Sequence, residues 1–143
     1  MKRTVLFLFP LIALLFMLGG AGSALAGGPT HHLIIQVSDD NPRTMKIALN
    51  NAMNVVKALG QDNVEVEIVA YGPGLKLLLN KNKAFRDRVQ SLQFYGIRFV
   101  ACKNTMNKMK VTKKDLVSGV TVVQAGVLEI MTKEEQGWSY VRP

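Results

Sequence analysis

Short apolar runs alternate with longer helical stretches along this chain, and that alternation restricts its fold more than any other feature. Five runs have the length and apolar content of buried strands: residues 32–37, 64–69, 97–101, 120–123 and 138–141. Segments with helical spacing or helix-ending signals lie between them: residues 43–59, 75–79, 84–94, 105–109, 113–117 and 125–136. Parallel strands need such crossover connections. The pattern predicts an α/β fold, a single flavodoxin-like three-layer domain with a mostly parallel five-stranded sheet.

One strand has a more polar pattern than the others. Glu65 and Glu67 alternate with valines in the second run. Because alternation indicates a strand with one polar face, we expect this strand to lie nearer the edge of the sheet.

The amino terminus has the features of a secreted precursor. Two basic residues precede a nearly uncharged apolar run over residues 4–18, and small residues follow up to Ala26. This order is typical of a cleavable signal peptide. We expect residues 1–26 to be removed, leaving residues 27–143 as one α/β domain that is periplasmic or secreted and free of the membrane. An uncleaved anchor is the alternative, since the same segment could almost cross a bilayer.

The charge balance is basic. The chain has 18 lysines and arginines against 10 acidic residues, a net charge of +8. Such an excess could attract acidic partners. Surfaces that bind nucleic acids interleave basic residues with aromatic ones, and here only Phe94 and Tyr95 lie near the basic residues in sequence. We therefore expect no nucleic-acid partner.

Cys102 is the only cysteine and follows the third predicted strand directly. Functional groups in open α/β sheets gather beyond the carboxyl ends of the strands. Lys103, Asn104 and Thr105 come next, and if they start a helix, its free N–H groups and the lysine favour the thiolate over the thiol. An inert cysteine buried at a strand end is an equally open interpretation.

A second loop at a strand end contains Tyr71, Gly72, Pro73 and Gly74. Its backbone N–H groups could hold an anion, but Leu77 stands where a dinucleotide-binding fingerprint would have its last glycine. The sequence favours a turn over a phosphate site.

Two methionines follow the cysteine at helical spacing. Cys102, Met106 and Met109 would share one face of an unbroken helix, and three soft sulfur ligands suit Cu(I) or haem. Methionines at this spacing more often fill a core. We therefore expect no cofactor and keep this metal site as an alternative.

Several short segments together resemble a known family. Residues 99–102 and the polar helix start after them are similar to the cysteine segment of the DsrE/DsrF-like family. Residues 71–74, 123–127 and 136–141 resemble its secreted branch, so the resemblance covers nearly the whole chain from His32 onward. It implies that residues 27–143 form a DsrE-like α/β domain.

The resemblance implies sulfur handling. In cytoplasmic members of the family, a cysteine in the equivalent loop accepts sulfur as a persulfide and passes it on, and Cys102 is the matching residue. We expect a periplasmic carrier that relays sulfane sulfur or reacts with a thiol partner, with turnover as a sulfurtransferase left open. Family members form dimers, trimers or hexamers, so a homo-oligomer is expected. The alternatives are a non-enzymatic module that binds a metal such as Cu(I), haem or a small molecule, and a structural oligomeric subunit.

Overall fold

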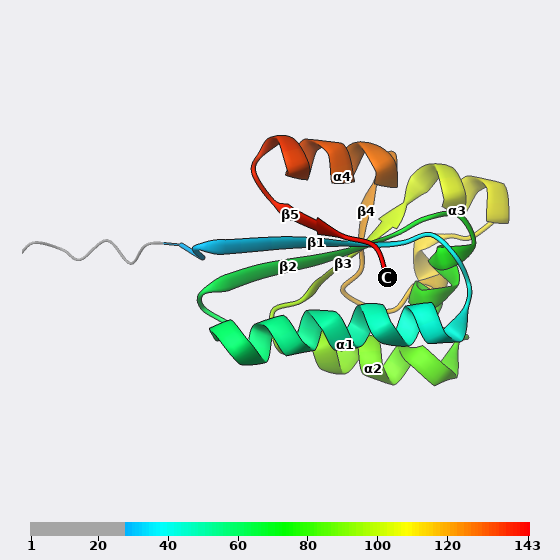
Figure 1. The fold of residues 1–143 in the computed structure, drawn as a ribbon. Helices are drawn as coiled ribbons and strands as arrows, with labels where there is room; N and C mark the ends of the chain where they lie inside the picture. Colours follow the sequence, from blue (N-terminus) through cyan, green and yellow to red (C-terminus); the bar gives the residue numbers. More distant parts are fainter. Residues whose placement is uncertain (1–27) are drawn as a thin grey trace, which may run out of the picture.

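The structure, a computed structural model, describes residues 28–143 and has a central sheet with helices on both faces (Figure 1). The expected signal segment lies outside the described residues, so its cleavage stays a prediction. No helix within residues 28–143 is long and apolar enough to cross a membrane.

The elements follow the predicted alternation. In chain order they are β1 (His31–Val37), α1 (Pro42–Leu59), β2 (Val64–Ala70), η1 (Gly72–Leu78), α2 (Lys83–Gln93), β3 (Arg98–Cys102), α3 (Lys103–Met109), η2 (Lys113–Asp115), β4 (Thr121–Val123), α4 (Gly126–Glu135) and β5 (Ser139–Val141). The segments η1 and η2 are 3₁₀ helices. Every predicted strand and helical segment has a counterpart, and only the bounds shift by a few residues.

The sheet has five strands, every neighbouring pair is parallel, and the order is β4-β3-β2-β1-β5. The predicted α/β class with its parallel five-stranded sheet is confirmed. The order differs from the 2-1-3-4-5 order of flavodoxin. It also places β2 at the centre of the sheet, so the expectation that β2 lies near an edge is wrong.

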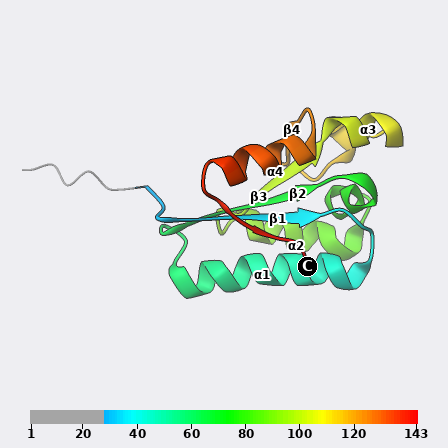
Figure 2. The same cartoon turned by 45° about the horizontal axis from the view of Figure 1, so that its top comes forward.

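The strand order follows from the faces that the crossovers occupy. Apolar residues of α1, of α2 and of the α3–η2 connection join one core cluster on one face of the sheet. Because crossovers are right-handed, connections on one face step in one direction, from β1 to β4. The helix α4 covers the opposite face (Figures 1 and 2), so the last crossover steps the other way and brings β5 beside β1.

The two faces of the sheet differ in polarity. The face under α1 and α2 is apolar, and α1 alone buries Met45, Ala48, Leu49, Ala52, Met53 and Val56 against it. The face under α4 has a smaller apolar cluster of Ile34, Val69, Val100, Ile130 and Trp138. The alternating glutamates of β2 belong to this second face, which explains why a central strand has a polar pattern.

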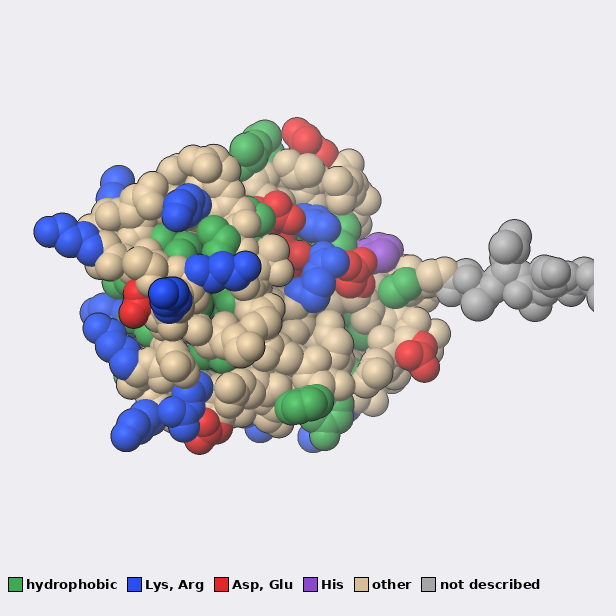
Figure 3. Space-filling model, turned by 180° about the vertical axis from the view of Figure 1, so that it is seen from behind, with side chains coloured by type: hydrophobic (Ala, Val, Ile, Leu, Met, Phe, Trp, Pro, Cys, Tyr) green, Lys and Arg blue, Asp and Glu red, His purple; other side chains and the backbone are tan. Residues whose placement is uncertain are grey.

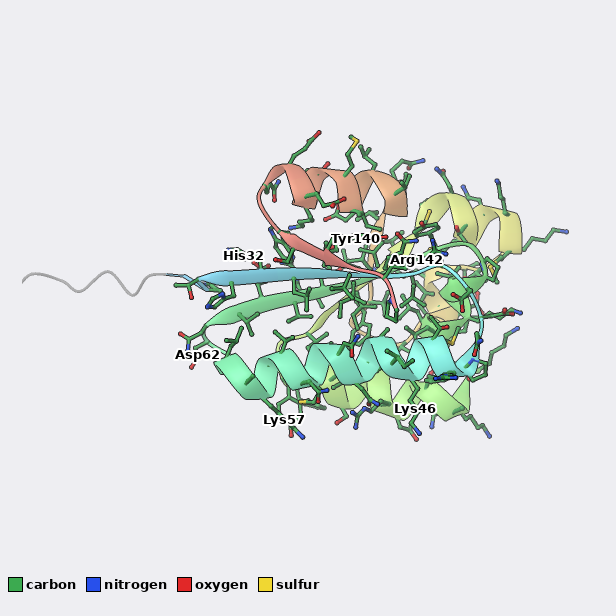
Figure 4. All side chains as sticks on the ribbon, in the orientation of Figure 1. His32, Lys46, Lys57, Asp62, Tyr140 and Arg142 are labelled. Atoms are coloured by element: carbon green, nitrogen blue, oxygen red, sulfur yellow. The ribbon has the colours of Figure 1, made fainter. Side chains whose placement is uncertain are left out.

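Arg98 neutralises these glutamates. Its guanidinium donates to Glu65 at 2.5 Å and to Glu67 at 2.6 Å. Trp138 lies 5.7 Å from that guanidinium and packs against the ring of His32, with 5.1 Å between the ring centroids; His32 is labelled at the start of β1 in Figure 4. Burial raises the pKa of Glu67 although Arg98 lowers it, and one oxygen of this carboxyl has no hydrogen-bond partner within residues 28–143.

Replacing this arginine should destabilise the fold in a pH-dependent way. Arg98→Ala leaves a buried carboxylate unpaired, and we expect a loss of about 2–3 kcal/mol at neutral pH, below the value for a fully enclosed pair because Arg98 is 45% exposed. A carboxyl with a raised pKa stabilises the fold when protonated, and this contribution is lost as the pH rises through its pKa. The loss should therefore shrink on acidification, as measured by urea unfolding at several pH values.

Two controls identify the cause of that effect. Glu67→Gln combined with Arg98→Ala should recover most of the loss at neutral pH. Arg86→Ala removes only an exposed pair with Asp87 and should cost under about 0.5 kcal/mol. An Arg98→Ala loss that does not change with pH would contradict the assignment to Glu67.

Candidate functional site

Three loops meet at the carboxyl edge of the sheet. They follow β2, β3 and β4, and they contain Gly72, Cys102 and Gly126. Because all three strands are parallel neighbours or next neighbours, their ends lie at the same edge. The structure thus brings together segments that lie far apart in the sequence.

Cys102 is the last residue of β3 and the N-cap of α3. It is 5% exposed, whereas Lys103 and Asn104 beside it are exposed. The predicted helix start after the cysteine is confirmed, and Asn104 and Thr105 do not interrupt it. Cys102 is therefore almost completely buried, directly before the first turn of α3.

The pKa of the Cys102 thiol is lowered from its ordinary value. Burial raises this pKa, but hydrogen bonds from the backbone N–H of Gly126, the hydroxyl and the N–H of Thr105, and the N–H of Asn104 lower it by more. Lys103 is not among the groups that lower it. Hydrogen-bond donors thus stabilise the thiolate, as a reactive cysteine requires.

Thr105 connects the cysteine to the loop after β2. The backbone N–H of Gly72 donates to the Thr105 hydroxyl oxygen at 2.9 Å, and that hydroxyl donates to Cys102. The threonine hydroxyl is thus an acceptor on one side and a donor on the other, so the Gly72 bond fixes the direction of its proton.

Gly126 is a residue of this site that reasoning from the sequence did not single out. A Cβ atom there would lie 3.1 Å from the Val69 side chain, 3.2 Å from Tyr71 and 3.3 Å from the Cβ of Cys102. A side chain there would require Val69, Tyr71 or Cys102 to shift by a few tenths of an ångström, and glycine lets the start of α4 approach the sulfur closely without such a shift. The sequence feature that could have indicated this residue is a glycine at the first position of the helix that follows the fourth strand.

Asn104 is tied to the same segment. Its backbone N–H is shared between Cys102 and the Gln124 carbonyl oxygen, which lies 3.3 Å away, and the Gln124 amide donates to the Asn104 side chain at 3.1 Å. These bonds hold the first turn of α3 against the β4–α4 loop, which also positions Gly126.

The predicted turn at residues 71–74 is the start of the 3₁₀ helix η1, with Tyr71 as its N-cap, and the backbone donors of this segment are used within the protein. The Gly72 N–H bonds to Thr105, the Gly74 N–H bonds to the Tyr71 carbonyl at 3.1 Å, and Pro73 has none. A Cβ at Gly74 would lie 2.2 Å from the Val37 carbonyl oxygen, so only glycine fits there. These contacts account for the loop without an anion.

The two methionines lie on the core side of α3. Met106 is buried in the large apolar cluster, and Met109 is partly buried against it. Cys102 does not belong to that cluster but bonds toward α4. Among the described residues, no group of three or more His, Cys, Asp or Glu side chains could hold a metal ion.

Removing the Thr105 hydroxyl should raise the pKa of Cys102. Thr105→Val keeps the side-chain shape but deletes both the donor to the sulfur and the acceptor for Gly72. Thr105→Ser is the matched control, because it keeps the hydroxyl and should leave the titration near that of the unmodified protein. The ultraviolet absorbance of the thiolate, followed against pH with Cys102→Ser as blank, measures the shift. An unchanged titration in Thr105→Val would contradict this role.

Comparisons with known proteins identify the family and the fold of this chain. Residues 34–143 match the DsrE/DsrF-like family. A protein of unknown function from Methanobacterium thermoautotrophicum is 30% identical, with a TM-score of 0.75, and the match covers 79% of this chain and 99% of that one. No curated protein matches the chain in sequence.

Two more distant structures share the fold. A conserved protein of unknown function from Bacteroides thetaiotaomicron is 20% identical over 77% of this chain and 92% of its own, with a TM-score of 0.63. The ychN protein from E. coli is 11% identical over 79% and 97%, with a TM-score of 0.61. The family match and the first structure together show that this chain belongs to the DsrE/DsrF-like family.

Proposed function

We propose that this protein is a sulfur carrier in which Cys102 accepts sulfane sulfur as a persulfide and passes it to a thiol partner. Membership of the DsrE/DsrF-like family suggests a role related to sulfur relay. The observation that carries the proposal is a buried cysteine at the carboxyl edge of the sheet whose pKa is lowered by hydrogen bonding to Gly126, Thr105 and Asn104. Thiolate is the form that attacks sulfur.

The transfer step needs only a sulfane donor. The Cys102 thiolate attacks the outer sulfur of a polysulfide or thiosulfate, a new S–S bond forms on the cysteine, and the donor's S–S bond breaks. The electron pair leaves with the shortened polysulfide or with sulfite. Since the chain has a single cysteine, no internal thiol can resolve the persulfide. An external thiol must then attack it, which makes the protein a carrier.

Exposure of the protein to polysulfide should increase its intact mass by about one sulfur atom (~32 Da), and a reductant should reverse the gain. Cys102→Ser should show no gain, because it keeps the site but lacks the sulfur nucleophile. A gain of equal size in the serine variant, or an unreactive thiol in the folded protein, would refute the carrier function.

The proposed compartment is the periplasm or the exterior of the cell. It rests on the sequence of residues 1–26, with a basic start, an apolar run and a small-residue site. Protein recovered after export should have Gly27 as its first residue in an intact-mass measurement. A mature chain that still begins at Met1 would contradict both the signal and the compartment.

A homo-oligomer is part of the same proposal. Val127, Leu128 and Met131 are 64%, 49% and 49% exposed and lie on one outer face of α4. Contiguous exposed apolar side chains mark surfaces that other chains cover. Light scattering should give a native mass that is a multiple of the chain mass. Leu128→Lys with Met131→Lys should reduce it to that of one chain, whereas a monomeric unmodified protein would exclude the oligomer.

A further inference from the structure

A hollow lies where the end of α3 meets the segments after η1 and around η2. Its volume is about 360 Å³. Three lysines, Lys81, Lys110 and Lys114, line it together with the apolar side chains of Met109 and Val111. Figure 3 shows lysine and arginine side chains gathered at the end of the molecule that holds α3. The hollow therefore combines apolar walls with amines.

The positive charge of this hollow exceeds its negative charge, although the charge of Lys81 helps to lower the pKa of Asp115 in the same hollow. All ten acidic residues of the chain fall within residues 28–143, and none of them forms an ion pair with Lys81, Lys110 or Lys114. Asp115 also lines the hollow, but Thr112 donates to it at 2.7 and 2.8 Å and lowers its pKa. Three cations thus face one carboxylate that already has its own donors.

Lys110 is held in an unfavourable backbone conformation. It ends α3 with φ +55° and ψ +36°, and within the described part of the chain it is the only non-glycine residue with a positive φ. Glycine is the residue preferred at such a helix end. A lysine here adds an amine to the hollow, and the helix end does not require one.

The hollow and the cysteine lie at opposite ends of one short helix. Cys102 is the N-cap of α3, and Met109 is its last residue. Seven residues of α-helix span about 10 Å. A protein seated on the hollow would therefore extend over the exposed side of α3 toward the sulfur.

We propose that this hollow binds an acidic segment of a partner protein, with a glutamate stem against Met109 and Val111 and its carboxylate among the three lysines. The apolar wall suits a side chain with methylene groups, and no aromatic residue lines the hollow to stack a nucleobase. Binding of an acidic segment in this hollow does not depend on the proposed sulfur-carrier function. The further idea that such binding brings a thiol partner to Cys102 rests on that function.

The test measures binding of a short fluorescein-labelled peptide of alternating Glu and Ala by fluorescence anisotropy. Lys81→Glu with Lys114→Glu should weaken binding about tenfold or more. Lys46→Glu with Lys57→Glu, which changes the net charge equally on α1 (Figure 4), should change it less than about twofold. Lys110→Gly should weaken binding while raising Tm, because the helix end is relieved.

Further measurements distinguish recognition of carboxylates in the hollow from an effect of net charge and from binding of other anions. A peptide with Gln in place of Glu should not bind, and Cys102→Ser should bind as the unmodified protein does, so failure of the carrier chemistry leaves this result intact. An equal loss of peptide affinity in the two double variants would mean that net charge alone causes the effect, and it would overturn the proposal. Tighter binding of a single-stranded oligonucleotide or of phosphatidylserine vesicles than of the acidic peptide would also overturn it.

Discussion

The parallel pairing of β2, β3 and β4 is the constraint on which the site depends. It brings the loops after these strands to one edge, although Gly72, Cys102 and Gly126 are distant in sequence. Short-range bonds then lock the loops together: Gly72 to Thr105, Asn104 to Gln124, and Gly126 to the sulfur. Asn104 and Thr105 reach the cysteine from the helix start beside it, but Gly126 reaches it only through the sheet register. The site is thus a property of the topology as much as of the residues around Cys102.

Two buried titratable groups show how hydrogen bonding decides the outcome of burial. Cys102 and Glu67 both lie in strands, and burial disfavours the charged form of each. Hydrogen bonding lowers the pKa of the thiol. The Glu67 carboxyl has Arg98 on one oxygen and no hydrogen-bond partner on the other within residues 28–143, and its pKa rises. The sheet therefore favours the anionic form of Cys102 and the protonated form of Glu67. Of the two, only Cys102 lies at the carboxyl edge, where ligands of parallel sheets bind.

The periodicity of the chain was enough to predict the elements, the parallel sheet and the position of Cys102 before a helix, because these depend on local pattern. The strand order was not predictable, since it depends on which face each crossover covers. The edge position expected for β2 was wrong because its glutamates pair with Arg98 from a neighbouring strand. The Gly126 donor and the lysine hollow were missed for a similar reason: each is assembled from segments that only the folded chain brings together.

Folding favours the thiolate form of Cys102 although it buries the residue. The most direct test is the pH dependence of its reaction with a small alkylating reagent, measured in the folded protein and in the same chain unfolded in urea. We expect a lower midpoint in the folded protein, because Gly126, Thr105 and Asn104 donate to the sulfur only there. A folded midpoint at or above the unfolded one would mean that burial prevails, and it would remove the physical basis for sulfur transfer at this site.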